Sequence, residues 1–118
     1  MTKVIFYKAN GVFYGFEEQG HTGYGAAGDD VLCAALSSMT MLIINAIEVA
    51  YASEVEYTID EKTADVRLIA KGALSAYEEN ENKRFAVSGL IMAYYYQLNE
   101  LTEEYYDYLS VDAVERPM

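Results

Sequence analysis

The chain has little cysteine, little histidine and little positive charge. Its 118 residues include one Cys, one His and one Pro, and 19 Asp plus Glu against 8 Lys plus Arg. A single Cys excludes an internal disulfide. One His and one Cys are too few soft ligands for zinc, so we expect no metal and no cofactor unless carboxylates or a second subunit complete a site.

The acidic balance also narrows the class of partner. A formal net charge of -11 argues against direct nucleic-acid binding, because phosphates would be repelled. The charge favours a basic partner such as a cationic protein, although an acidic protein with no such partner would have the same composition.

The sequence shows neither a signal peptide nor a convincing membrane span. The segment MTKVIFYKAN has no long apolar region and no small-residue cleavage site, which predicts a cytoplasmic protein. Residues 31–47 carry no charge, but the run is just short of a usual span and polar residues dilute it. We therefore expect no membrane segment, and we expect one folded domain over residues 1–118.

Periodicity and turn signals predict the order ββ-α-ββ-α-β. Asn10-Gly11 lies between two runs rich in β-branched and aromatic residues, which is a strong hairpin signal. This order predicts an α+β fold, with two helices packed on a mainly antiparallel sheet. The predicted strands are residues 3–8, 12–18, 54–59, 66–71 and 109–115, and the predicted helices are about 30–51 and 82–106.

The apolar spacing of the two helices predicts which residues face the core. Tyr94-Tyr95-Tyr96 and Tyr105-Tyr106 are typical of core or dimer contacts, and a substrate platform is the alternative. The predicted core positions are Leu32, Leu36, Met39, Leu42 or Ile43, Ala46 or Ile47, and Ala50 in the first helix, and Leu90, Tyr94, Leu98, Leu101 and Tyr105 in the second.

A glycine-rich stretch, GHTGYGAAGDDVLC, spans residues 20–33 and contains G-x-G-x-x-G at Gly23, Gly25 and Gly28. This spacing also occurs in dinucleotide-binding loops, where glycines let backbone N–H groups approach a pyrophosphate. Here Asp29 and Asp30 would repel the anion, and the flanking strands form hairpins instead of a βαβ unit. Nucleotide binding is therefore the weaker interpretation.

The same stretch places the only His twelve residues before the only Cys. If Asp29 or Asp30 caps the helix, Cys33 lies in its first turn, where unpaired N–H groups favour a thiolate and could stabilise an oxyanion. The glycines could bring His21 beside Cys33, with Asp30 orienting the ring. Ser37, one turn later, is either bonded to its own backbone or a polar neighbour of the site. Cys33 alone could equally be a small buried hydrophobe.

These residues resemble the ribosomal-processing cysteine protease family (Prp). The resemblance rests on Gly20-His21, on Asp30-Val31-Leu32-Cys33-Ala34-Ala35 followed by Ser37, and on Asn45-Ala46-Ile47. Thr22 departs from the usual Ala of the family. The resemblance covers nearly the whole chain, and its specificity lies in residues 20–47.

The resemblance implies a cysteine endopeptidase that removes a short N-terminal extension from a bacterial large-subunit ribosomal protein. It implies a homodimer, with His21 and Cys33 as the catalytic pair and Asp30 and Ser37 as supporting residues. A mobile loop would close over the substrate. Its residues would be Thr22, Gly23, Tyr24, Gly25, Gly28 and Asp29. A non-catalytic module that binds the ribosome or a ribosomal protein is the alternative.

Overall fold

The computed structural model describes residues 1–20, 27–60, 62–63 and 65–118, and for residues 27–30 it describes the course of the backbone. The observed order confirms ββ-α-ββ-α-β. The elements are β1 (Thr2–Ala9), β2 (Val12–Gln19), α1 (Ala27–Asn45), the π-helical turn η1 (Ala46–Ala50), β3 (Glu56–Ile59), β4 (Val66–Ile69), the 3-10 turn η2 (Lys71–Ala73), α2 (Glu81–Glu104) and β5 (Leu109–Glu115).

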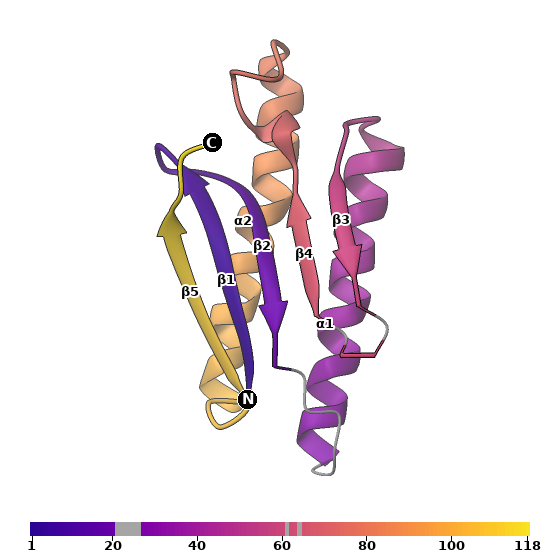
Figure 1. Cartoon of the computed structure of the whole chain (residues 1–118), viewed down its shortest axis with the longest axis vertical. Coiled ribbons are helices and arrows are strands. Elements are labelled where there is room, and N and C mark those ends of the chain that lie inside the picture. Colours follow the sequence, from indigo (N-terminus) through magenta and orange to yellow (C-terminus); the bar gives the residue numbers. More distant parts are fainter. Residues whose placement is uncertain (21–26, 61, 64) are drawn as a thin grey trace.

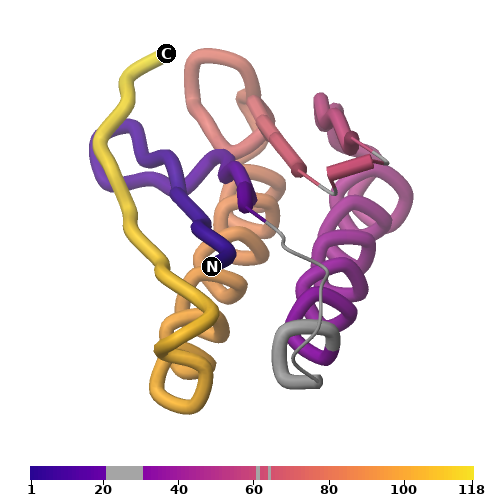
Figure 2. The backbone as a smooth tube through the Cα atoms, turned by 60° about the horizontal axis from the view of Figure 1, so that its bottom comes forward, coloured from indigo at the N-terminus to yellow at the C-terminus, as the bar shows by residue number. Residues whose placement is uncertain are grey.

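The five strands form one sheet in the order β3-β4-β2-β1-β5. Three neighbouring pairs are antiparallel and only β1–β5 is parallel, so the predicted mainly antiparallel sheet is confirmed. Figure 1 shows both helices on the same side of this sheet, and the turned view in Figure 2 shows the same layering. The structure is therefore a two-layer α+β fold with one sheet face left uncovered by helices.

The first hairpin turns at Asn10-Gly11, as the sequence predicts. Both residues have positive φ, 52° and 79°, which is the conformation that a two-residue turn of the favoured twist requires. A distant residue completes the turn, because the Glu115 carboxylate accepts the backbone N–H groups of Asn10 at 3.0 Å and Gly11 at 2.8 Å. The end of β5 thus holds the turn between β1 and β2.

Aromatic side chains from the sheet and α2 form the centre of the core. The ring centroids of Phe6 and Phe16 lie 5.7 and 5.1 Å from that of Tyr94. Tyr95 packs on Phe6 at 5.2 Å, whereas Tyr96 is 61% exposed. The predicted core role of the tyrosine run is confirmed for Tyr94 and Tyr95, while Tyr96 lies at the surface.

The predicted core faces of the helices need small corrections. On α1, Ile43 is buried and Leu42 is 66% exposed, so the second alternative holds. Ala50 is exposed because a π-helical turn replaces the α-helix after Asn45 and rotates the following residues. On α2, the buried residues are Val87, Ile91, Tyr94 and Leu98, whereas Leu90, Leu101 and Tyr105 are half-buried.

Residues Val31–Ala50 form a helix long and apolar enough to cross a membrane by length and composition. Core helices of soluble proteins pass the same test, so this is weak evidence for a span. In this fold one side of the segment is buried in the core. Its buried residues are Leu32, Leu36, Thr40, Ile43, Ile44 and Ile47.

Candidate active site

The start of α1 differs from the sequence prediction. The helix begins at Ala27, so Gly28, Asp29 and Asp30 lie inside it and neither aspartate is the N-cap. Ala has the highest helix propensity, and here it outweighs the preference of Asp for the N-cap position. The helix therefore begins earlier than Asp29-Asp30 indicates. Gly28 and Asp29 therefore belong to the helix and not to the predicted loop.

This shift changes the position of Cys33. Cys33 is the seventh residue of α1, which places it in the second turn and not in the first. The unpaired N–H groups and the strongest dipole effect belong to the first turn. The prediction that Cys33 lies in the first turn is therefore wrong. In the second turn the helix terminus does little to favour a thiolate.

Cys33 has Ser37 and the backbone of Asp30 among its neighbours along α1. Cys33 is half-buried, and Ser37, one turn later, is exposed. The backbone of Asp30 lies one turn before Cys33. Helical spacing thus brings the positions of Asp30, Cys33 and Ser37 together along one part of α1. The remaining predicted site residues, His21, Thr22, Gly23, Tyr24 and Gly25, lie outside the described residues.

Gly20, the residue before the candidate histidine, has a structural reason to be glycine. Its φ is 78°, and a Cβ at this position would lie 2.6 Å from the Met1 carbonyl oxygen. Its N–H donates to Asp65 Oδ1 at 3.3 Å. Backbone strain and a close backbone contact therefore both oppose any other residue here. The glycine fixes where the chain leaves β2.

A buried carboxyl group that the sequence analysis missed lies between β2 and both helices. Glu18 is 1% exposed. Its Oε1 accepts hydrogen bonds from Thr40 Oγ1 of α1 at 3.1 Å and from the Tyr94 hydroxyl of α2 at 2.5 Å. Burial raises the pKa of Glu18 to about 7, although both hydrogen bonds act to lower it. The Glu18–Thr40–Tyr94 cluster is thus a polar link between three elements.

The sequence pattern places polar residues of this cluster at positions that are expected to be buried. Strand alternation places Glu18 on the same face as Phe16, which is a core face. Thr40 is likewise a polar residue on the buried side of α1, two turns after Cys33. A charged residue on a buried strand face needs a partner, so the pattern indicates a buried polar contact without identifying its members.

The arrangement gives no support to a nucleotide or metal site. A dinucleotide loop requires adjacent parallel strands around the helix, but β4 lies between β2 and β3 and is antiparallel to both. In the part of the chain that the structure describes, no three side chains of His, Cys, Asp or Glu gather closely enough to hold a metal ion.

Comparison with known families decides the class of protein. The sequence profile of the family described as cysteine protease Prp matches residues 1–110. The chain belongs to the Prp cysteine protease family. It is accordingly a cysteine protease, as the resemblance in residues 20–47 implies. Comparison with curated proteins gives no match.

Solved structures agree with the Prp fold. The crystal structure of SMU.848 from Streptococcus mutans is 25% identical, with a TM-score of 0.80 over 98% of this chain and 96% of that one. The essential ribosomal processing protease Prp from S. aureus, in complex with a substrate peptide, is 16% identical, with a TM-score of 0.78 over 97% of this chain and all of that one. Its complex with a covalently linked product peptide gives a TM-score of 0.70 at 17% identity. The whole two-layer architecture is therefore shared.

Proposed function

We propose that this protein removes the N-terminal extension of a bacterial large-subunit ribosomal protein, with Cys33 as the nucleophile. The observation that carries the proposal is the match to the Prp family over residues 1–110, which include the only Cys and the only His of the chain. The S. aureus Prp of the same fold is a ribosomal processing protease. A protein with a net charge of -11 is also suited to a basic ribosomal protein.

In the proposed mechanism, the Cys33 thiolate attacks the scissile carbonyl carbon. His21 takes the thiol proton and gives it to the leaving amine, and water then hydrolyses the acyl–Cys33 thioester, which releases the extension as an acid and restores the thiol. Because Cys33 lies in the second turn of α1, the helix terminus contributes little to its activation, and His21 carries this role. Asp30 orients the imidazole, and Ser37 is a polar neighbour of the nucleophile.

The oxyanion needs donors other than the N–H of Cys33. In an α-helix the N–H of the seventh residue is used by the carbonyl of the third, so this group is occupied within α1. We assign the donors and the closure over the substrate to the segment between β2 and α1, which includes Thr22, Gly23, Tyr24 and Gly25. The protein acts in the cytoplasm, where its substrate is made, and it binds no nucleic acid directly.

We also propose that the protein is a homodimer that meets its partner through the outer face of α1. This face carries Val31, Met41 and Leu42, which are 58%, 42% and 66% exposed. No charged residue occurs from residue 31 to 47. Two copies of an acidic chain repel each other least where they present no charge. Sedimentation should give a dimer for the wild type and a monomer for Leu42→Glu, and a monomeric wild type would contradict the proposal.

The experiment that tests the protease mixes the protein with the extended ribosomal protein and records intact masses. We expect one loss of mass equal to the N-terminal extension. Cys33→Ala and His21→Ala should each slow cleavage at least about a thousandfold without lowering the melting temperature, whereas Ser37→Ala should slow it about tenfold. Iodoacetamide should alkylate Cys33 more slowly in the His21→Ala variant. Full activity of Cys33→Ala would overturn the assignment of the nucleophile.

A further inference from the structure

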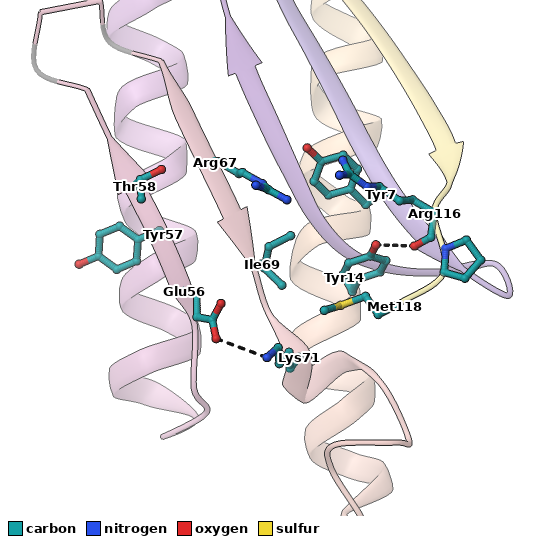
Figure 3. A pocket seen from close by; sticks show the side chains of 11 residues that line it. Tyr7, Tyr14, Glu56, Tyr57, Thr58, Arg67, Ile69, Lys71, Arg116 and Met118 are labelled. Carbon is teal, nitrogen blue, oxygen red and sulfur yellow. Dashed lines mark hydrogen bonds and ion pairs between the residues drawn. The ribbon is translucent and has the colours of Figure 1, made fainter.

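A cavity of about 500 Å³ opens on the sheet face that the helices leave uncovered. Figure 3 shows its lining side chains in front of the strands, with both helices behind. Its walls combine aromatic and apolar side chains with cationic ones. The lining includes Tyr7, Tyr14, Tyr57, Ile69 and Met118, together with Arg67, Lys71 and Arg116.

The cations of this cavity are unusual for such an acidic chain. Three of the eight Lys and Arg residues line it. Lys71 Nζ lies 3.5 Å from a Glu56 carboxylate oxygen, so that charge is already paired. Arg67 and Arg116 remain as the cations that a ligand would meet. Glu17, opposite Arg67 on β2, and Glu115, next to Arg116, are further carboxylates near these groups.

The position of Arg116 is fixed by its backbone. Its N–H donates to the Lys8 carbonyl at 2.7 Å, and its carbonyl accepts from the Tyr14 hydroxyl at 2.5 Å. The guanidinium carbon lies 4.9 Å from the centroid of the Tyr7 ring. This stacking holds a planar, bidentate donor at the wall of the cavity.

The Tyr7 side chain is a buried part of the cavity wall. Tyr7 is 1% exposed, and its hydroxyl lies beside the Glu17 carboxylate; burial and then this neighbour raise the pKa of Tyr7 to about 12. In Figure 3 this hydroxyl and the guanidinium of Arg67 point toward one another.

We propose that this cavity binds a single carboxylate carried on an aromatic or apolar group, such as the C-terminal residue of a peptide. Arg67 and Arg116 hold the carboxylate oxygens, and the tyrosine rings and Ile69 pack on the attached group. Lys71 is paired with Glu56 and Arg67 faces Glu17, so the cavity has little positive charge in excess and suits a single carboxylate, not a polyanion. The overall charge of -11 also excludes nucleic acid as the occupant.

The test titrates N-acetyl-phenylalanine into the protein and follows the arginine side-chain NMR signals and the heat of binding. N-acetyl-phenylalaninamide is the uncharged match, and inorganic phosphate is the competing anion. Arg67→Gln removes one guanidinium, and Arg67→Lys keeps the charge without the planar fork. Lys3→Gln is the control, because it removes one cation from the same sheet face outside the cavity.

We expect saturable binding of the acid to the wild type and to Lys3→Gln, at least tenfold weaker binding to Arg67→Gln, and an intermediate loss for Arg67→Lys. The amide should bind at least tenfold more weakly than the acid. Equal binding of acid and amide, equal loss in Lys3→Gln and Arg67→Gln, or tighter binding of phosphate than of the acid would each overturn the proposal. Unchanged melting temperatures would show that the variants are folded, since Arg67 is exposed.

Discussion

The two helices lie on the same sheet but are held there in different ways. α2 begins with an N-cap, in which the Asn80 side chain accepts the Lys83 N–H at 3.1 Å, and it packs along β2 and β5 through Ile91 and its neighbours. α1 has no charged residue between positions 31 and 47 and leaves an apolar face exposed. The difference indicates that α2 supports the fold, whereas α1, which carries the proposed nucleophile Cys33, is positioned in part by the Glu18–Thr40 hydrogen bond.

The largest expected effect is on the free energy of unfolding, and it distinguishes the buried face of α2 from the exposed face of α1. Ile91→Ala on α2 should lower the free energy of unfolding by about 2–5 kcal/mol, because a fully buried side chain leaves a cavity. Leu42→Ala on α1, where the side chain is 66% exposed, should change it by no more than about 0.5 kcal/mol in the monomer. Urea denaturation at low protein concentration measures both. Similar losses would show that the exposed apolar face of α1 contributes as much to folding as the buried face of α2.

The next effect concerns the pH dependence of the Glu18–Thr40–Tyr94 cluster. The pKa of Glu18 is about 7 in the folded protein, against 4.5 for an ordinary Glu. Between these values the folded state keeps a proton that the unfolded state has lost. The free energy of unfolding therefore falls as pH rises from 4.5 to 7, by about 3 kcal/mol in total, and stays lower above that range.

Glu18→Gln should remove this dependence. The free energy of unfolding of the variant minus that of the wild type should be about 3 kcal/mol higher at pH 8 than at pH 4, as measured by urea denaturation. Glu17→Gln is the matched control, since it makes the same change at the neighbouring position of β2, on the opposite face of the strand. The same pH profile for both variants would rule out Glu18 as the source.

The smallest effects on stability come from two glycines, one whose backbone conformation requires glycine and one whose conformation does not. Gly20→Ala should destabilise the protein by about 1–2 kcal/mol, because φ is positive and the new Cβ would meet the Met1 carbonyl. Gly89→Ala, in the middle of α2 with open space around it, should stabilise it by about 0.5–1 kcal/mol. Melting temperatures compare the pair. A stabilising Gly20→Ala would mean that the exit from β2 is not constrained as described.

Local signals explain what the sequence could predict. The Asn10-Gly11 turn, the strand alternation and the helical periodicity each depend on residues within a few positions, and the resulting element order is confirmed. The start of α1 was misplaced because Ala27 and the two aspartates are competing local signals of similar strength.

Contacts between distant residues explain what the sequence could not predict. Glu18 meets Thr40 and Tyr94 across 22 and 76 positions, so its burial was not predicted. Arg67 and Arg116 come together only through the sheet order, so the cavity was not predicted either. The pairing of His21 with Cys33 stays a prediction, because His21 lies outside the described residues.

The parallel pairing of β1 with β5 has a consequence for synthesis of the chain on the ribosome. β1 is made long before its outer neighbour, Leu109–Glu115, and the Glu115 carboxylate also holds the Asn10-Gly11 turn. A nascent chain therefore cannot complete its sheet until this late strand has emerged from the exit tunnel. Folding of the whole sheet is coupled to translation of these residues, so partly made chains should not accumulate as working enzymes.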